Sequence, residues 1–162
     1  MDPVMLATDG SPAAAGAAKT AIELAAALGA PLLIVTCWDA AYTGAVLGFG
    51  PVVPDLDHIG QEQAEQVADE AAERARAAGV AAMTYVRRGD PASRICRIAA
   101  DRDARLIVIG SHGWGALRRL VFGSVSTGVL HHARNPVLVV PTRPVKVGDN
   151  GRVRSVETGG AR

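Results

Sequence analysis

The chain has 162 residues, the length of a single domain, and a hydrophobic content of 49%, which is enough for one core. It has no run of about 18 apolar residues, which argues against a membrane span. Its opening Met1-Asp2-Pro3 is unlike a signal peptide, so we expect a cytoplasmic protein. Residues 1–142 carry twelve basic and fourteen acidic residues, whereas residues 143–162 carry five basic and two acidic ones. We therefore expect one domain over 1–142 and a disordered basic tail over 143–162, with no membrane or nucleic-acid partner.

The first predicted element is an apolar strand over residues 4–8, which ends at Asp9-Gly10. Ser11 is suited to a helix N-cap and Pro12 to the first helical position, so a helix is expected to begin there. This alanine-rich helix should end at Gly29, because glycine readily adopts the left-handed conformation at a helix terminus.

Strands and helices continue to alternate after this point. The segment 39–55 is long for a connection and contains several glycines and prolines, so it acts either as a lid over a ligand or as a disordered link. Asp90-Pro91 should open a helix. The remaining predicted elements are a strand over 32–38, a helix over 59–78 with a small apolar stripe at 64, 67, 71, 75 and 78, a strand over 82–86, a strand over 105–109, a helix over 125–133 and a strand over 137–140.

This alternation predicts an α/β fold with an open, doubly wound parallel sheet of five strands and helices on both faces. In such sheets a ligand binds beyond the carboxyl ends of the strands, where the strand order reverses. For the order 3-2-1-4-5 this point lies between the first and fourth strands. The residues that follow these two strands are Asp9-Gly10 and Gly110 to Gly113.

A glycine-rich loop follows the fourth predicted strand. Gly110-Ser111-His112-Gly113 is separated by nine residues from Gly123-Ser124, where a helix is expected to start. Glycines let backbone N–H groups converge on phosphate oxygens, and the helix dipole adds to the attraction. Neither a lysine-bearing P-loop nor a G-x-G-x-x-G helix start occurs. The pattern therefore predicts phosphate or nucleotide binding.

Three charged side chains are candidates for ligand contacts. Asp9 can accept a hydrogen bond from an adenine amino group or a ribose hydroxyl, hold a metal through water, or cap the first helix. Arg118 and Arg119, within the loop, either neutralise phosphate charge or face solvent.

Three further candidates flank the glycines. A hydroxyl of Ser124 or Ser126 can cap the following helix and meet a phosphate oxygen. His112 either polarises a phosphate, holds the loop or is a turn residue in solvent. The loop has no lysine and no carboxylate pair is evident, so we expect binding with at most slow hydrolysis, no catalytic residues and no metal held by side chains alone.

These residues resemble the ATP-binding members of the universal stress protein family. The match rests on G-x2-G-x9-G-[ST], here Gly110, Gly113, Gly123 and Ser124, and extends to Thr8-Asp9-Gly10-Ser11, Gly89-Asp90-Pro91 and residues 135–141. It covers about residues 2–142.

The resemblance implies ATP at the switch point, often with magnesium or manganese on its phosphates. Asp9 would contact the adenosine, and the end of the second strand near Cys37 would lie beside the base, although the family more often has a branched aliphatic residue there. It also implies a homodimer formed through the last strand. The residues implied to line the phosphates are Gly110, Gly113, Gly123, Ser124 and Val125, and those implied at the dimer contact are Val137, Leu138, Val139 and Val140.

The expected function is that of an ATP-binding stress-response protein. A phosphorylated receiver module is rejected, because the third strand should end in Arg87-Arg88-Gly89 where that module needs an aspartate. An ATP hydrolase or adenylating enzyme and a dimeric interaction protein that needs no nucleotide remain as alternatives.

Overall fold

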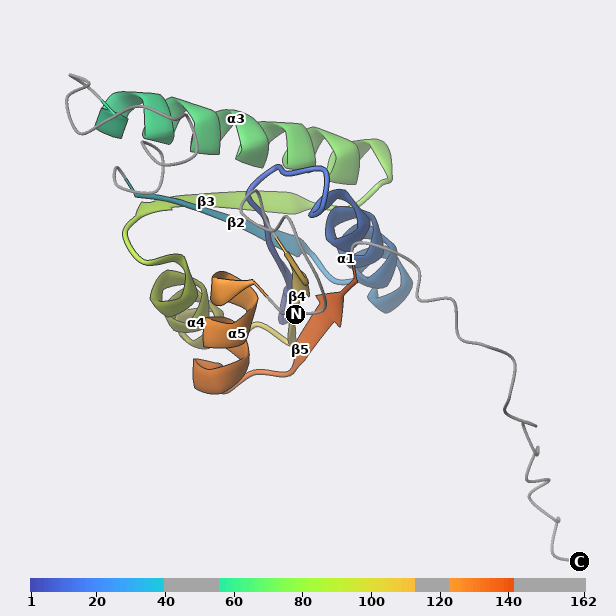
Figure 1. The fold of residues 1–162 in the computed structure, drawn as a ribbon. Helices are drawn as coiled ribbons and strands as arrows, with labels where there is room; N and C mark the ends of the chain where they lie inside the picture. The colour runs from blue at the N-terminus through green and yellow to red at the C-terminus, as the bar shows by residue number, and fades with distance from the viewer. Residues whose placement is uncertain (40–55, 113–122, 142–162) are drawn as a thin grey trace, which may run out of the picture.

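The computed structural model describes residues 1–39, 56–112 and 123–141. The strand order is β3-β2-β1-β4-β5 and every pairing is parallel, which confirms the predicted fold class and order (Figure 1). The elements are β1 (Val4–Ala7), α1 (Ala15–Leu28), β2 (Leu32–Trp38), α3 (Leu56–Ala77), β3 (Ala82–Arg88), α4 (Pro91–Asp101), β4 (Leu106–Gly110), α5 (Ser124–His132) and β5 (Val137–Val140).

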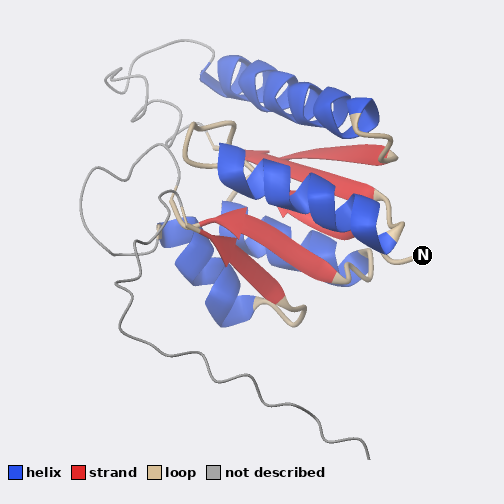
Figure 2. Cartoon of the chain, turned by 90° about the vertical axis from the view of Figure 1, so that its right-hand side faces the viewer, coloured by secondary structure: helices blue, strands red, loops and turns tan. Residues whose placement is uncertain are grey.

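Helices cover both faces of the sheet, as Figure 2 shows. Successive residues of a strand point to opposite faces of the sheet, so with helices on both faces the central strands are buried on both sides. Val4 and Leu6 of β1 pack with α1 and α3, whereas Met5 and Ala7 pack with α4 and α5. The continuous apolar runs in the sequence are therefore required by burial on two sides.

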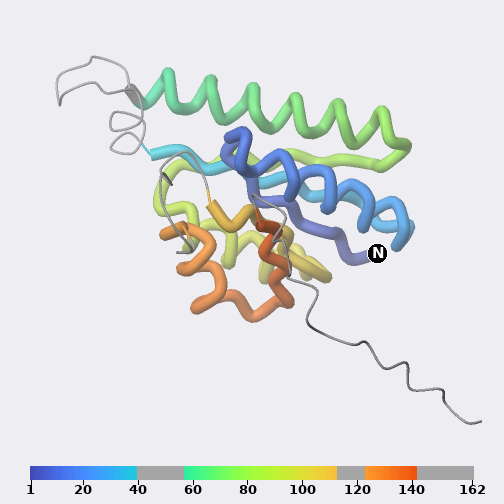
Figure 3. The backbone as a smooth tube through the Cα atoms, turned by 45° about the vertical axis from the view of Figure 1, so that its right-hand side comes forward, coloured from blue at the N-terminus to red at the C-terminus, as the bar shows by residue number. Residues whose placement is uncertain are grey.

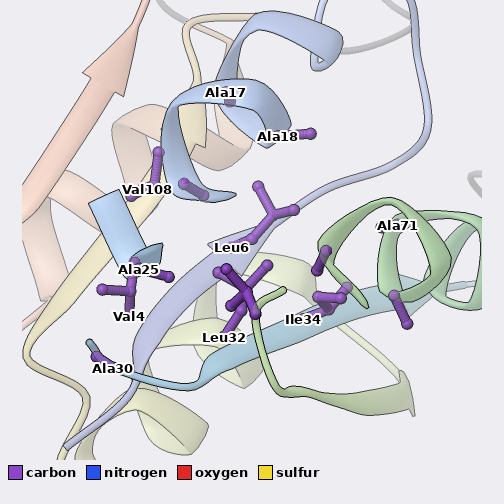
Figure 4. Close-up of a cluster of buried hydrophobic side chains, with 14 of the residues drawn as sticks. Val4, Leu6, Ala17, Ala18, Ala25, Ala30, Leu32, Ile34, Ala71 and Val108 are labelled. Carbon is purple, nitrogen blue, oxygen red and sulfur yellow. The ribbon is translucent and has the colours of Figure 1, made fainter. Parts of the chain in front are cut away.

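Alanines form the contact between the sheet and the helices α1 and α3 (Figure 4). Their small side chains let α1 and α3 pack close to the larger residues of the strands. In α3 the predicted stripe is largely correct, but Ala78 is exposed and lies one residue beyond the end of the helix. The buried residues of α3 are Ala64, Ala68, Ala71, Ala72 and Ala75.

The predicted start of the first helix was wrong by a few residues. α1 begins at Ala15, and the residues after Ser11 form a turn. The Ser11 hydroxyl accepts a hydrogen bond from the Ala14 N–H at 3.2 Å, so it stabilises this turn instead of capping α1. The predicted end was correct, because Gly29 adopts φ 60° directly after Leu28.

The lower layer in Figure 1 consists of α4 and α5, which lie side by side in Figure 3 as well. Asp90 caps α4 as predicted, since its carboxylate accepts a hydrogen bond from the Ser93 N–H at 2.9 Å. The two helices approach closely at Gly128, where an added Cβ would lie 2.7 Å from the Cβ of Ala92. Within the described ranges, none of the helices combines the length and the apolar character needed to cross a bilayer.

Candidate functional site

The ends of β1 and β4 lie together at the carboxyl edge of the sheet. The two strands are neighbours, with Ala7 paired to Ile109 in the register. A Cβ on Gly110 would lie 3.3 Å from the carbonyl oxygen of His112 and 3.5 Å from that of Ala13. The segment after β4 therefore packs against the turn after β1, and a side chain at position 110 would crowd this contact.

Asp9 and Gly10 form a tight turn after β1. The Ser11 N–H donates to Asp9 Oδ1 at 3.0 Å, and the Gly10 N–H donates to Thr8 Oγ1 at 3.2 Å. The Asp9 carboxylate thus stabilises the backbone before α1. This contact is similar to the helix-capping role, which was one of the alternatives predicted for Asp9. Because the side chain is only half-buried, this contact is compatible with a ligand at the same edge.

Gly10 has a packing role that the sequence did not reveal. Its φ is +71°, which L side chains rarely adopt, and a Cβ there would lie 2.5 Å from Cγ2 of Val67. The turn after β1 therefore fits directly beneath α3.

Ser111 connects three parts of the site, and it was missing from the predicted ligand contacts. Its N–H donates to the carbonyl oxygen of Val140 at 2.8 Å, and its carbonyl oxygen accepts a hydrogen bond from the Gly123 N–H at 2.8 Å. The Ser111 hydroxyl lies 3.0 Å from Nδ1 of His112. The only signal in the sequence was its position between an apolar strand and a glycine loop.

The start of α5 has no side-chain cap, so the expected hydroxyl cap is absent. Ser126 is 2% exposed, and its hydroxyl donates toward the carbonyl oxygens of Ser111 at 3.1 Å and Gly123 at 2.9 Å. Ser124 is exposed and Val125 packs partly against the core. In the described part of the chain, the first-turn N–H groups of α5 therefore have no side-chain acceptor, which favours an anion at this end.

Gly123 occupies the N-cap position in an extended conformation, with φ −60° and ψ 156°. A Cβ there would make only ordinary contacts, the nearest being 3.5 Å from Ser111 O and His112 Cα. The fold of the described residues therefore does not require glycine at this position.

Cys37 lies near the end of β2, two strands from β4. Burial raises the pKa of its thiol to about 12, so the side chain is a neutral, partly buried group. It packs against the core on the α4 side.

Some of the predicted ligand contacts lie outside the described residues, namely Gly113, Arg118 and Arg119. Most of the long segment after β2 and the basic tail, for which a lid and disorder were predicted, lie outside them as well. Among the described residues, no three His, Cys, Asp or Glu side chains gather in a way that would hold a metal ion.

Comparison with known proteins identifies the family to which the chain belongs. Residues 1–141 match the model of the universal stress protein family. The chain belongs to the universal stress protein family. The universal stress protein Rv2005c of Mycobacterium tuberculosis is 33% identical to it over 138 residues, which cover 85% of this chain and 44% of the relative. The chain thus spans less than half of the length of that relative.

Solved structures of universal stress proteins and their relatives share the fold. The structure of the hypothetical protein MJ0577 has a TM-score of 0.74 and 25% identity, and the match covers 89% of this chain and 99% of that one. A universal stress protein in complex with cAMP has a TM-score of 0.64 and 26% identity, with coverage of 88% and 98%. Nucleotide binding therefore occurs on this fold in at least one similar protein.

Proposed function

We propose that this universal stress protein binds an adenine nucleotide, with ATP as the preferred ligand, at the carboxyl edge between β1 and β4. The observation that carries the proposal is the convergence of the Asp9 turn, Gly110 and the uncapped start of α5 at one edge of the sheet. The cAMP complex of a similar protein supports an adenine nucleotide as the ligand class. In this proposal the nucleotide state regulates a response to stress in the cytoplasm.

The described residues fit such a ligand in their donor chemistry. Backbone N–H groups at the start of α5 would hold phosphate oxygens, as would the hydroxyl of the exposed Ser124. Asp9 would contact the adenosine, and Cys37 would lie beside the base. Gly113, Arg118 and Arg119 complete the proposed phosphate contacts from outside the described residues.

Ser126 and His112 have supporting roles in this proposal. The Ser126 hydroxyl joins the start of α5 to Ser111, and the His112 ring lies against the Ser111 hydroxyl. Both contacts stabilise the backbone at Ser111 and at the start of α5, which would preorganise these described parts of the site for binding.

Magnesium or manganese, if it accompanies the nucleotide, would be carried mainly by the phosphate oxygens. Such hard cations are often bound through substrate phosphates and few protein carboxylates. The ion would neutralise phosphate charge, while the protein supplies the backbone donors.

The alternative is a dimeric interaction protein that acts through β5. This strand is the last in the sheet, and Leu138 is 36% exposed on it. An apolar edge strand tends to pair with a second chain, so we propose that Val137–Val140 forms a homodimer contact whether or not nucleotide is bound.

Thermal unfolding with and without ATP and magnesium tests the nucleotide proposal. At about 100 times Kd the ligand should stabilise the fold by roughly 2.7 kcal/mol, or about 5–10 °C for a domain of this size. Adenosine, which lacks phosphates, is the matched control and should give a much smaller shift. If ATP gives no shift and no nucleotide is bound on purification, the interaction protein is favoured. Product formation from ATP within minutes would instead favour a hydrolase or adenylating enzyme.

A further inference from the structure

A hollow lies between β3 and α4, two strands away from β1. In Figure 1, α3 covers one side of β3, and α4 lies on the other side. The hollow has a volume of about 430 Å³, within the range of small-molecule sites. Ile98 contributes an apolar part of its lining, and the other lining residues are Tyr85, Arg87, Arg94, Arg97, Asp101 and Arg102.

Contacts within the protein orient three of the four guanidinium groups. Arg87 and Arg102 lie over the ring of Tyr85, at 5.1 Å and 4.7 Å from its centroid. Arg94 donates from Nε to the carbonyl oxygen of Arg88 at 3.0 Å. These contacts orient the three arginines before any ligand arrives, which lowers the entropy cost of binding.

The charge of the hollow contrasts with that of the domain. Four of the twelve basic residues within 1–142 line it, although this part of the sequence is acidic overall. Among the described residues, the single lining carboxylate belongs to Asp101, which lies 3.6 Å from Nε of Arg97. Positive charge therefore exceeds negative charge by three, and an anion in the hollow would relieve the mutual repulsion of the arginines.

We propose that this hollow binds a small polyanion that carries phosphate groups. Guanidinium groups match phosphate oxygens in a two-point geometry, and four of them suit a ligand with several such oxygens. The site is separate from the β1–β4 edge and does not depend on nucleotide binding there.

The surroundings argue for a small ligand over a long one. Helix α3, on the other side of β3, exposes a row of acidic side chains, which would repel an extended nucleic acid that continued past this edge of the sheet. The segment 143–162 of this chain is itself basic and has the wrong charge to occupy the hollow. The exposed acids of α3 are Glu62, Glu65, Asp69, Glu70 and Glu73.

Calorimetric titration with inorganic tripolyphosphate tests the proposal. The full chain carrying Gly123→Val is used as the background, because this change is expected to block the glycine loop. Tripolyphosphate should still bind it, and adding Arg97→Gln and Arg102→Gln should weaken the affinity about tenfold or more. Arg74→Gln with Arg76→Gln, on α3, removes the same charge elsewhere and should leave the affinity within about twofold.

A single substitution in the hollow separates a direct effect on binding from an indirect effect on the fold. Arg97 is 73% exposed in its side chain, so Arg97→Gln alone should fold normally and still weaken binding. The side-chain Nε–H resonances of Arg94 and Arg97 should shift on titration of the Gly123→Val background. The proposal is overturned if this background does not bind tripolyphosphate, or if the α3 pair weakens binding as much as the pair in the hollow. ATP binding to the unmodified chain is measured separately, so failure of the nucleotide proposal is distinguishable from failure of this one.

Discussion

Replacing Gly10 by alanine should destabilise the fold through two separable effects. The first is the backbone conformation, since φ +71° costs an L residue about 1–2 kcal/mol. The second is overpacking, because the new Cβ would lie 2.5 Å from Cγ2 of Val67 and that stiff, branched side chain would have to move. Overpacking of this kind costs about 1–3 kcal/mol, so the total loss should be about 2–5 kcal/mol.

Gly29→Ala is the matched control for this change. Its φ is +60°, close to that of Gly10, but a Cβ there would have no atom within 4 Å. Urea unfolding should therefore show a loss of only about 1–2 kcal/mol for Gly29→Ala. A double-mutant cycle with Val67→Ala should recover the overpacking component of Gly10→Ala. If Gly10→Ala costs no more than Gly29→Ala, the close contact between the β1 turn and α3 is refuted.

Four further predictions address the ligand, the dimer and the titratable groups. Gly123→Val should abolish ATP binding in calorimetry and leave the urea midpoint nearly unchanged, because its Cβ is accommodated; unchanged affinity would remove the loop from the site. Leu138→Asp should shift sedimentation from dimer to monomer, since a charge on this exposed edge residue opposes strand pairing, and an unaltered dimer would contradict the β5 contact. Asp90→Ala should lower the unfolding free energy by about 1 kcal/mol at neutral pH. Hydrogen bonds from Ser93 lower the pKa of the Asp90 carboxyl. The stabilisation of the fold by the Asp90 carboxylate is therefore present above the unfolded pKa of this group and is lost as the pH falls below about 4. A loss of unfolding free energy in Asp90→Ala that persists at about pH 2 would contradict this role of the carboxylate. With its pKa raised to about 12 by burial, Cys37 should react with iodoacetamide at about pH 8 two to three orders of magnitude more slowly than in the unfolded chain, as mass spectrometry can measure.

The strands were predictable because burial on both faces leaves a strong signal, whereas their order was implied by the resemblance to the universal stress protein family. Apolar runs such as Leu32–Val35 have few alternatives once helices alternate with them. Helix ends were predictable where one residue decides them locally, as Asp90 and Gly29 do. The start of α1 was not, because Ser11 bonds within a preceding turn and a helix cap and such a turn use the same residue types.

The candidate site also has one part that could be predicted from the sequence and one part that could not. The position of Asp9 and Gly110 at one edge follows from the strand order, which the family resemblance implies. The hydrogen bonds of Ser111 and the buried hydroxyl of Ser126 depend on how α5 and β5 pack, and residue types alone do not specify them.

The sequence by itself determined the α/β class, because hydrophobic periodicity is a local property. The strand order and the edge at which a ligand is expected followed from the glycine motif through the resemblance to the universal stress protein family. Only the tertiary structure decided that Gly10 is needed beneath Val67 and that four arginines from different parts of the chain line one hollow together with Tyr85. Both features come from side chains that belong to different elements. Their distances are set by how helices and strands pack, which no local pattern in the sequence encodes.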